Sequence, residues 1–396
     1  MGLGPASAPA TAGEVFQLIR TGVADTRSAV GRATGLSRTA VSARLALLLA
    51  AGLVVEGAEG SSTGGRPAAT LRFDHTSGVV LAGAIGRSRT QLAVCDLYGE
   101  VLAGADLEQE PGAVPSDLMP AAVTRLGELL TEAGKTGADV RGVGLSLPGT
   151  VDRVRGVSLD SPIMPGWNGV DLAPYFRGLT DGPVLVDNDT NVMALSERQA
   201  VGGHLGTYDD VLLVKASTGV GAGIVLDGEL RRGALGAAGE VGHTKTAPGR
   251  GMICRCGDVG CLETVAGGWA LVQAMREQGR DVDHVRSLVA LANDGDPEAR
   301  RLVRESGRRV GEVLAGAVNL LNPAAVVVGG DMVLAYDTFA AGLRETLYGG
   351  ATALATRELQ ILPATHGDAA GVVGCAALAL DHVLSVAAVD HLAAAL

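Results

Sequence analysis

The sequence predicts an α/β protein with a small helical head at its N-terminal end, and three observations carry this prediction. The chain has 396 residues, of which 47% are apolar, so it can bury a large core and form more than one domain. From residue 77 onward, strand-like segments alternate with helix-like segments, which indicates an α/β fold with two sheets. Residues 1–73 carry seven Arg and four Asp or Glu, whereas the remaining 323 residues carry 25 Lys or Arg and 39 Asp or Glu.

This uneven charge limits the partners that each part can have. The net charge of −11 argues against a general nucleic-acid binder, but the first 73 residues are positive, so only they are expected to approach DNA. The longest apolar stretch, residues 45–55, is about half a membrane span. No signal-peptide pattern is visible. We therefore expect a cytoplasmic protein with no membrane partner.

Three helices and a turn are predicted in the head. Apolar residues at helical spacing indicate helices over residues 14–20 and 26–33, and a third helix after Ser37, which is a good N-cap. Gly35 lies in the short turn between the second and third helices. Two helices joined by a short turn that contains Gly are typical of a helix-turn-helix.

A wing is predicted after the third helix. Residues 53–55 and 70–73 are typical of two strands, and Arg66 lies in the Gly/Ser-rich segment between them. A slim backbone with one arginine suits a narrow minor groove, where the potential is most negative. The alternative is a small helical cap or protein-interaction module. The candidate DNA-contacting side chains are Arg38, Thr39, Ser42, Arg44 and Arg66.

The rest of the chain is predicted to form the strands and helices of two sheets. The predicted strands cover residues 79–85, 90–96, 141–147, 184–186, 211–216, 223–226, 325–328 and 360–363. The predicted helices cover residues 120–133, 191–200, 267–277, 285–293, 297–319 and 338–347.

Three of the five cysteines form the strongest chemical signal. Cys254, Cys256 and Cys261 lie within eight residues, and His243 is the natural fourth ligand of a tetrahedral zinc site. Four protein ligands leave no open position, so the metal is expected to be structural. The alternative is a set of free cysteines. The other two, Cys95 and Cys375, are expected in the core.

Carboxylates near this cluster are candidates for binding a hydroxyl-rich ligand. Glu240 precedes His243 by three residues, and Glu263 follows Cys261 by two, although both could equally be solvated surface acids. Asp189 follows a predicted strand, where side chains of α/β proteins point into the ligand crevice. It could take a proton from a hydroxyl group. The alternative is N-capping by Asp189 or Thr190.

A glycine-rich segment follows the strand at 211–216. Residues 217–223, which include Gly219 and Gly221, are expected to form a turn between two strands. Backbone N–H groups in such a turn can hold phosphates, although the same glycines would serve a tight hairpin equally well.

These motifs together resemble the ROK family of repressors and sugar kinases, from about residue 78 to about 390. The matching segments are residues 147–152, 166–172, 187–191, 219–223, 239–243, 254–263, 322–323 and 328–330. The resemblance implies a two-lobed, actin-like sugar-kinase fold. The small lobe would cover about 78–187 plus the C-terminal helix, and the large lobe about 188–374. The winged head would occupy 13–73, after a flexible segment at 1–12.

The resemblance also implies the residues of the site. Zinc would be held by His243, Cys254, Cys256 and Cys261. Sugar would contact Gly149, Asn188, Asp189, Glu240, His243 and Glu263.

One segment departs from the family pattern. Family kinases carry Asp-x-Gly-Gly-Thr-Lys on the first hairpin, whereas here Ala84 replaces the Asp and Arg87 replaces the second Gly. Phosphoryl transfer depends on metal and positioning, so this loss should be severe. Asp189 would then be a vestigial base, and Gly219 and Gly221 a vestigial phosphate loop.

The resemblance therefore implies a sugar-responsive transcriptional regulator, a repressor rather than an enzyme. It would bind operator DNA as a homodimer or tetramer. One alternative is a working ATP-dependent sugar kinase, with Asp189 as base and Ser88 and Arg89 holding nucleotide. Another interpretation is that Arg87 and Arg89 attract a phosphorylated sugar as the effector.

Overall fold

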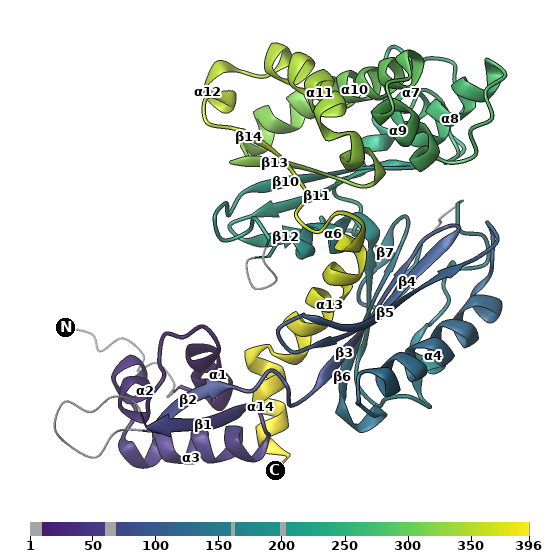
Figure 1. Cartoon of the computed structure of the whole chain (residues 1–396). Coiled ribbons are helices and arrows are strands. Elements are labelled where there is room, and N and C mark those ends of the chain that lie inside the picture. The colour runs from purple at the N-terminus through teal and green to yellow at the C-terminus, as the bar shows by residue number, and fades with distance from the viewer. Residues whose placement is uncertain (1–9, 60–68, 160–162, 199–202, 396) are drawn as a thin grey trace.

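The structure is a computed structural model, and it describes residues 10–59, 69–159, 163–198 and 203–395. The head contains α1 (Ala12–Arg20), α2 (Arg27–Thr34) and α3 (Arg38–Ala50), followed by the antiparallel strands β1 (Val54–Glu59) and β2 (Ala69–Phe73) (Figure 1). This is the winged helix-turn-helix that the sequence predicts, although α1 begins two residues earlier than expected.

Side-chain caps explain where the helices of the head begin. The side chains of Thr11, Thr26 and Ser37 each accept a backbone hydrogen bond at the start of α1, α2 and α3. Gly35 ends α2 at φ +69°, a left-handed conformation that glycine adopts without strain. Residues 60–68, and with them Arg66, which the sequence predicts in the wing, lie outside the described residues.

The first sheet of the body has five strands and is covered on both faces. Its order is β5 (Val101–Glu108), β4 (Arg89–Asp96), β3 (Val79–Ile85), β6 (Val140–Leu147) and β9 (Val184–Asn188). Strands β3, β6 and β9 are parallel, whereas β4 and β5 run antiparallel to their neighbours. Alternate residues of β3 pack on α4 (Pro115–Glu132) and on α13 (Ala370–Val383). That burial on both faces explains the unbroken apolar run of β3.

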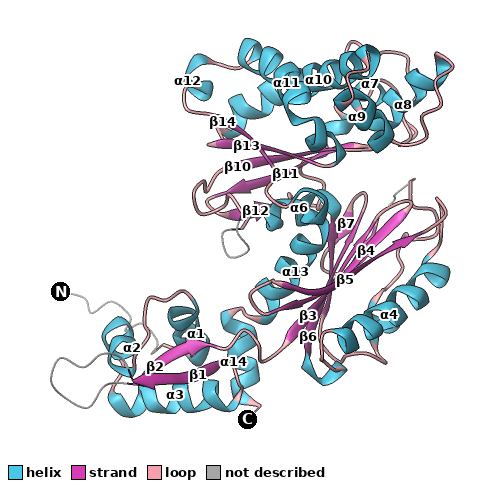
Figure 2. Cartoon of the chain, viewed as in Figure 1, coloured by secondary structure: helices cyan, strands magenta, loops and turns pink. Residues whose placement is uncertain are grey.

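The second sheet has a different arrangement of helices (Figure 2). Its order is β12 (Glu229–Arg231), β11 (Val220–Leu226), β10 (Val211–Ala216), β13 (Ala325–Gly329) and β14 (Gln360–Pro363). One face packs against a layer of four helices, and α6 (Asp189–Ser196) packs on the other. The four helices are α8 (Gly268–Glu277), α9 (Val285–Asn293), α10 (Pro297–Leu321) and α11 (Tyr336–Gly350).

Short elements complete the described part of the chain. They are β7 (Val151–Asp152), β8 (Val157–Ser158), α5 (Ala173–Phe176), α7 (Glu263–Ala266), α12 (Ala353–Thr356), α14 (Val386–Ala394) and 3-10 helices at Gly137–Asp139, Val241–His243, Asp331–Ala335 and Gly367–Ala369.

The head and the body share one hydrophobic core. Phe16 of α1 and Tyr98 of the β4–β5 turn both make edge-on contacts with Phe73, at 5.3 Å between ring centroids. Helix α1 also packs against α14: the Gly13 amide donates to the Asp390 carboxylate at 2.7 Å, and Gln17 donates to the Leu384 carbonyl at 2.6 Å. Helix α13 therefore leads from the first sheet to the surface on which the head sits (Figure 1).

Among the described residues, no single helix is both long enough and apolar enough to cross a membrane. One pair of helices, Gly367–Val383 and Val386–Ala394, has the length and composition together, but it is bent by 53°.

Candidate functional site

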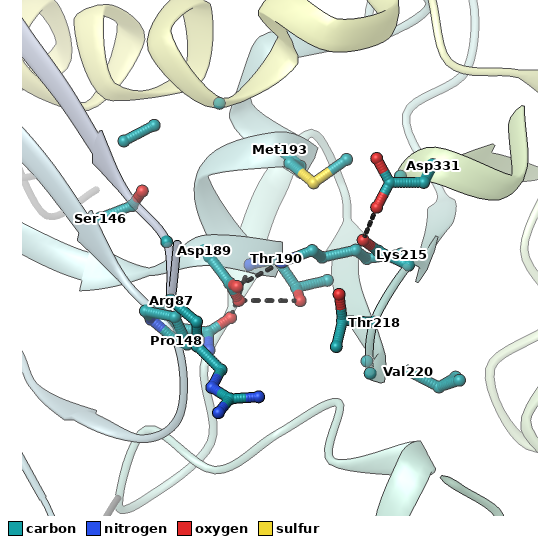
Figure 3. A pocket seen from close by; sticks show the side chains of 18 of the residues that line it. Arg87, Ser146, Pro148, Asp189, Thr190, Met193, Lys215, Thr218, Val220 and Asp331 are labelled. Carbon is teal, nitrogen blue, oxygen red and sulfur yellow. Dashed lines mark hydrogen bonds and ion pairs between the residues drawn. The ribbon is translucent and has the colours of Figure 1, made fainter. Parts of the chain in front are cut away.

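A pocket of about 560 Å³ opens between the two sheets (Figure 3). The first sheet contributes residues at the carboxyl ends of its parallel strands, such as Ser146 of β6 and Asn188 of β9. The second sheet contributes Lys215 near the end of β10 and the turn that follows it. Ligands of α/β proteins bind at this edge of a parallel sheet, so the topology places a candidate binding site here.

Asn188 shapes the first wall of the pocket. Its side-chain oxygen accepts the backbone N–H groups of Thr190 and Asn191 at 2.8 and 3.1 Å, so it caps α6. The expectation that Asp189 or Thr190 is the cap was wrong, because α6 begins at Asp189 itself. The Asn188 amide donates to the Gly149 carbonyl at 2.8 Å, which brings two predicted sugar-contacting residues together.

Asp189 is neutralised by a lysine that sequence reasoning missed. The Lys215 ammonium forms an ion pair with the Asp189 carboxylate inside the pocket (Figure 3). Lysine occurs at only three positions in the chain, and that rarity was the one signal that could have drawn attention to Lys215. A carboxylate oxygen that already accepts a bond from a cation is poorly placed to take a proton from a substrate.

Glu263 is buried, with 7% of its surface exposed, so it is not a solvated surface acid. Its carboxylate accepts hydrogen bonds from the Val220 amide at 3.1 Å, the Trp269 indole at 3.1 Å and the Arg255 guanidinium at 3.3 Å. Arg255 also lies over the Trp269 ring, 5.0 Å from its centroid. Neither Arg255 nor Trp269 was predicted.

Glu240 and His243, which also line the pocket, lie next to each other. The Glu240 carboxylate is 3.8 Å from Nε2 of His243. Burial raises the pKa of Glu240, and the nearby His243 partly opposes this rise. The pocket lining therefore includes Asn188, Asp189, Glu240, His243, Glu263 and Gly149, which are the six residues expected to contact sugar.

The predicted zinc ligands converge. One ligand atom from each of His243, Cys254, Cys256 and Cys261 lies within 4.8 Å of the other three. The Cys256 and Cys261 sulfurs are 3.8 Å apart, and Nδ1 of His243 is 3.8 Å from the Cys254 sulfur. Tetrahedral zinc with bonds of about 2.3 Å separates two thiolates by about 3.8 Å. The cluster can therefore hold a metal ion, and it fits zinc.

The remaining two cysteines lie in the core, as expected. Cys95 and Cys375 are fully buried, and burial raises the pKa of each thiol to about 12. Both thiols are therefore unreactive at neutral pH.

The part of the pocket near the altered first hairpin is crossed by ion pairs. Arg89 contacts Asp106 at 2.7 Å and Asp368 at 2.9 Å, so the expectation that it is available to a phosphate finds no support. Arg286 of α9 contacts the same Asp368 at 2.6 Å and Asp331 at 2.7 Å. We call these five residues the interlobe ion-pair chain, because it connects β4 of the first sheet with α9 beside the second.

Arg87 behaves differently from Arg89. It lines the pocket, and no interaction is marked between it and the other side chains drawn in Figure 3. Its Nε atom is buried and has no hydrogen-bond partner among the residues that the structure describes.

The glycine-rich segment is a hairpin rather than one long turn. Only residues 217–219 form the turn, and Gly221 lies within β11 opposite Lys215. A Cβ atom on Gly219 would lie 2.5 Å from the Glu263 carboxylate, and one on Gly221 would lie 2.8 Å from the Thr190 hydroxyl. Glycine is thus needed for close packing of the pocket walls.

The predicted DNA-contacting side chains of the head differ in their exposure to solvent. Arg38, Thr39 and Ser42 are exposed in the first turns of α3. Arg44 is half-buried and donates to the Ala10 carbonyl at 2.7 Å, so its guanidinium is engaged within the head.

Residues 80–382, most of the chain, match the family model described as the ROK family. The chain belongs to the ROK family. A xylose repressor of Caldicellulosiruptor bescii is 28% identical over 372 residues, which are 91% of this chain and 92% of the repressor. A glucokinase of Halalkalibacterium halodurans is 30% identical over 307 residues, which are 73% of this chain and 91% of the kinase.

Solved structures also divide into regulators that cover nearly the whole chain and kinases that cover about three quarters of it. A ROK family transcriptional regulator, described as a homologue of the Escherichia coli MLC protein, superposes with a TM-score of 0.80 at 27% identity. It covers 96% of this chain and 98% of its own. A ROK glucokinase from Streptomyces griseus, in complex with glucose and AMPPNP, gives a TM-score of 0.63 at 31% identity and covers 76% of this chain and 98% of its own. The regulators thus match the head as well as the body.

Proposed function

We propose that this ROK protein is a sugar-responsive transcriptional repressor of carbohydrate genes. The observation that carries the proposal is that one chain contains both a DNA-binding fold and a polar pocket. A winged helix-turn-helix with exposed Arg38, Thr39 and Ser42 is joined to a body whose pocket gathers polar groups suited to hydroxyls. Relatives that match both parts include xylose repressors, whereas the kinase relatives match about three quarters of the chain.

The pocket supplies the groups that a sugar requires. Carboxylates such as Glu240 and Glu263 accept hydrogen bonds from neighbouring hydroxyls, and the Asn188 amide adds a donor and an acceptor. His243 faces two ways: Nδ1 lies near the cysteine thiols and Nε2 lies on the Glu240 side. A metal on Nδ1 would fix the orientation of the ring that meets the sugar.

Zinc is the metal we assign to His243, Cys254, Cys256 and Cys261. The ion would hold in place the loop that carries Glu240, His243 and Glu263. Its four protein ligands would leave no coordination position for a substrate. Its role in this proposal is therefore structural.

We further propose that the chain does not transfer phosphate. Three features support this: Ala84 stands where family kinases carry Asp, Lys215 neutralises Asp189, and the interlobe ion-pair chain crosses the space beside the first hairpin. The competing proposal is an active sugar kinase, which the glucokinase relatives favour.

DNA binding would use two copies of the head. In a homodimer or tetramer, α3 of each head would lie in the major groove of a pseudo-palindromic operator, with Arg66 in the adjacent minor groove. Sugar can control this binding only if its affinity differs between the DNA-bound and free forms of the protein.

Operator binding in the presence of sugars tests the proposal. We expect the full chain to bind the DNA upstream of its own gene, and one sugar of a panel to change the affinity by tenfold or more. Arg38→Ala should weaken operator binding, whereas Arg177→Ala, exposed on the body, should not. A steady sugar turnover of about 1 per second in an ADP-release assay would instead favour the kinase.

Arg87 favours a second candidate for the effector, a phosphorylated sugar. Its buried, unpartnered Nε atom lies in the pocket, and Lys215 cancels the charge of Asp189 nearby. An anionic group at this end of the sugar would meet an arginine whose Nε atom has no partner among the described residues. Comparing the free and 6-phosphorylated forms of each sugar in the panel decides between the two effectors.

A further inference from the structure

A second cavity, of about 270 Å³, shares no lining residue with the sugar pocket. Three arginines line it, namely Arg153, Arg198 and Arg232, together with Glu229 and Asp381. Leu195, Leu230 and Leu378 complete the lining, and the three arginines outnumber the two carboxylates. We call it the arginine cavity.

The arginine cavity lies where several parts of the molecule meet. Arg153 comes from the turn between β7 and β8, and Arg198 follows the end of α6. Arg232 follows β12 of the second sheet, and Asp381 lies on α13. A fourth arginine, Arg20 of α1, reaches close enough from the head to interact electrostatically with Asp381 and Arg198.

Only part of this positive charge is paired. Arg198 contacts Asp381 at 2.9 Å, and Arg232 contacts Asp187 at 2.7 Å. Within the described part of the chain, Arg20 and Arg153 make no hydrogen bond or ion pair, and Nε of Arg198 is buried without a partner.

The arginines also repel one another. Burial lowers the pKa of Arg153, and the charge of Arg232 lowers it further, while Asp187 and Asp381 oppose this. Burial likewise lowers the pKa of Arg20, and Arg198 adds to that effect while Asp381 opposes it. Arg153 is exposed, whereas Arg20 and Arg198 are half-buried. The buried Nε atom of Arg198 lacks a partner among the described residues, and a buried donor without a partner destabilises the folded state, so it calls for an explanation.

We propose that the arginine cavity binds a small oxyanion, either free phosphate or the phosphoryl group of a metabolite. An oxyanion accepts several charge-assisted hydrogen bonds at once, and guanidinium groups match its geometry. It would give Arg153 and the free Nε of Arg198 a partner and would offset the repulsion among the arginines. The cavity has room for a phosphate and for part of the molecule that carries it.

This site is independent of the sugar pocket and of the proposed repressor function. Because Arg20 belongs to the head and Arg153, Arg198 and Arg232 to the body, a bound anion would also strengthen the attachment of the head. We therefore expect anion binding to raise the thermal stability of the full chain.

Thermal unfolding of the full-length protein in sodium phosphate, compared with sodium chloride at equal ionic strength, tests the proposal. We expect a saturable, phosphate-dependent rise in Tm and a matching heat of binding by calorimetry. Arg153→Gln should weaken phosphate binding by tenfold or more, without lowering the Tm measured in chloride. Arg155→Gln is the matched control, because Arg155 lies in the same turn and is exposed like Arg153, but does not line the cavity.

Two further arms locate the site and identify the source of the anion. Arg87→Gln should leave phosphate binding unchanged, which excludes binding in the sugar pocket. Glucose 6-phosphate binding tighter than phosphate to this variant would point to a metabolite, whereas equal or weaker binding would point to free phosphate. The proposal is overturned if millimolar phosphate gives no saturable shift, or if Arg153→Gln binds phosphate as the wild type does.

Discussion

The two ends of the interlobe pocket use their charged groups in opposite ways. At the end that we propose binds sugar, Glu240, His243 and Glu263 line the pocket beside the cysteine-rich loop. At the other end, Arg89 and Arg286 form ion pairs with Asp106, Asp331 and Asp368. A charged group that is already paired binds a ligand weakly. One pocket can therefore bind a sugar at one end without binding a phosphate at the other.

Removing a metal ligand should have the largest effect on the proposed sugar-binding end of the pocket. Cys256→Ala leaves three ligands, and structural zinc contributes on the order of 10 kcal/mol to small zinc modules. We expect loss of bound metal, measured by elemental analysis, and loss of any sugar-dependent change in operator affinity. Asp258→Asn is the control, because Asp258 lies in the same loop but is not a ligand. A Cys256→Ala protein that keeps its sugar response would show that the loop does not depend on metal.

Replacing Glu263 should have the next largest effect. Glu263→Gln removes the charge that Arg255 and Trp269 donate to, and a hydrogen bond to a charged group is worth about 1.5–3 kcal/mol. We expect that loss in chemical denaturation, together with sugar binding weakened by tenfold or more. Glu240→Gln should weaken sugar binding with a smaller loss of stability, since its side chain is 38% exposed. Equal losses of stability would contradict the burial difference.

Breaking the interlobe ion-pair chain should have a small effect. Arg286→Gln removes contacts to Asp331 and Asp368, but Arg286 is 42% exposed, so we expect a loss of about 0.5–1 kcal/mol. The loss should shrink in high salt, which screens exposed pairs. Arg301→Gln, which breaks a pair within α10 only, is the control for effects that do not cross between the sheets. A salt-independent loss would mean that packing dominates.

The same chain of ion pairs predicts a dependence on pH. The hydrogen bond from Arg89 lowers the pKa of Asp106 below its usual value. The stability from this pair is therefore complete above a pH of about 4 and is lost as the pH falls through the lowered folded-state pKa. An Asp106→Asn variant should lack this part of the acid transition in a thermal-unfolding series.

Rebuilding the first hairpin should have the smallest effect of all. The double variant Ala84→Asp, Arg87→Gly restores two kinase-like residues, but Lys215 still neutralises Asp189 and the ion-pair chain remains. We expect steady sugar phosphorylation to stay below about 1 per second in an ADP-release assay. Turnover above that rate would show that the hairpin alone separates the two functions.

The sequence predicted elements best where a local pattern decides them. Strand β10, strand β14 and helix α9 have the predicted bounds, because apolar periodicity and flanking turn residues act within a few positions. Edge strand β5 was missed, since its side chains alternate between exposed and half-buried. Helix α13 was left without bounds, because it is buried nearly all round and shows no polar face.

The site was predictable as a set of residues but not as a set of contacts. The cysteine spacing predicted the cluster that could hold a metal ion, because its four residues lie within 19 positions of sequence. The contact between Arg89 and Asp368 joins residues 279 positions apart, and that between Lys215 and Asp189 joins strand β10 with the first residue of helix α6. No local pattern carries such pairings, which follow only from the topology.

The contact between α1 and α14 has a consequence for how the molecule is made. The Gly13 amide and the Asp390 carboxylate are 377 residues apart. At roughly 5–20 residues per second, a ribosome that has finished α1 needs about 20 to 75 seconds to produce its neighbour. During that interval the head is synthesised before its docking surface, so the side of α1 that contacts α14 stays uncovered until α14 has been made.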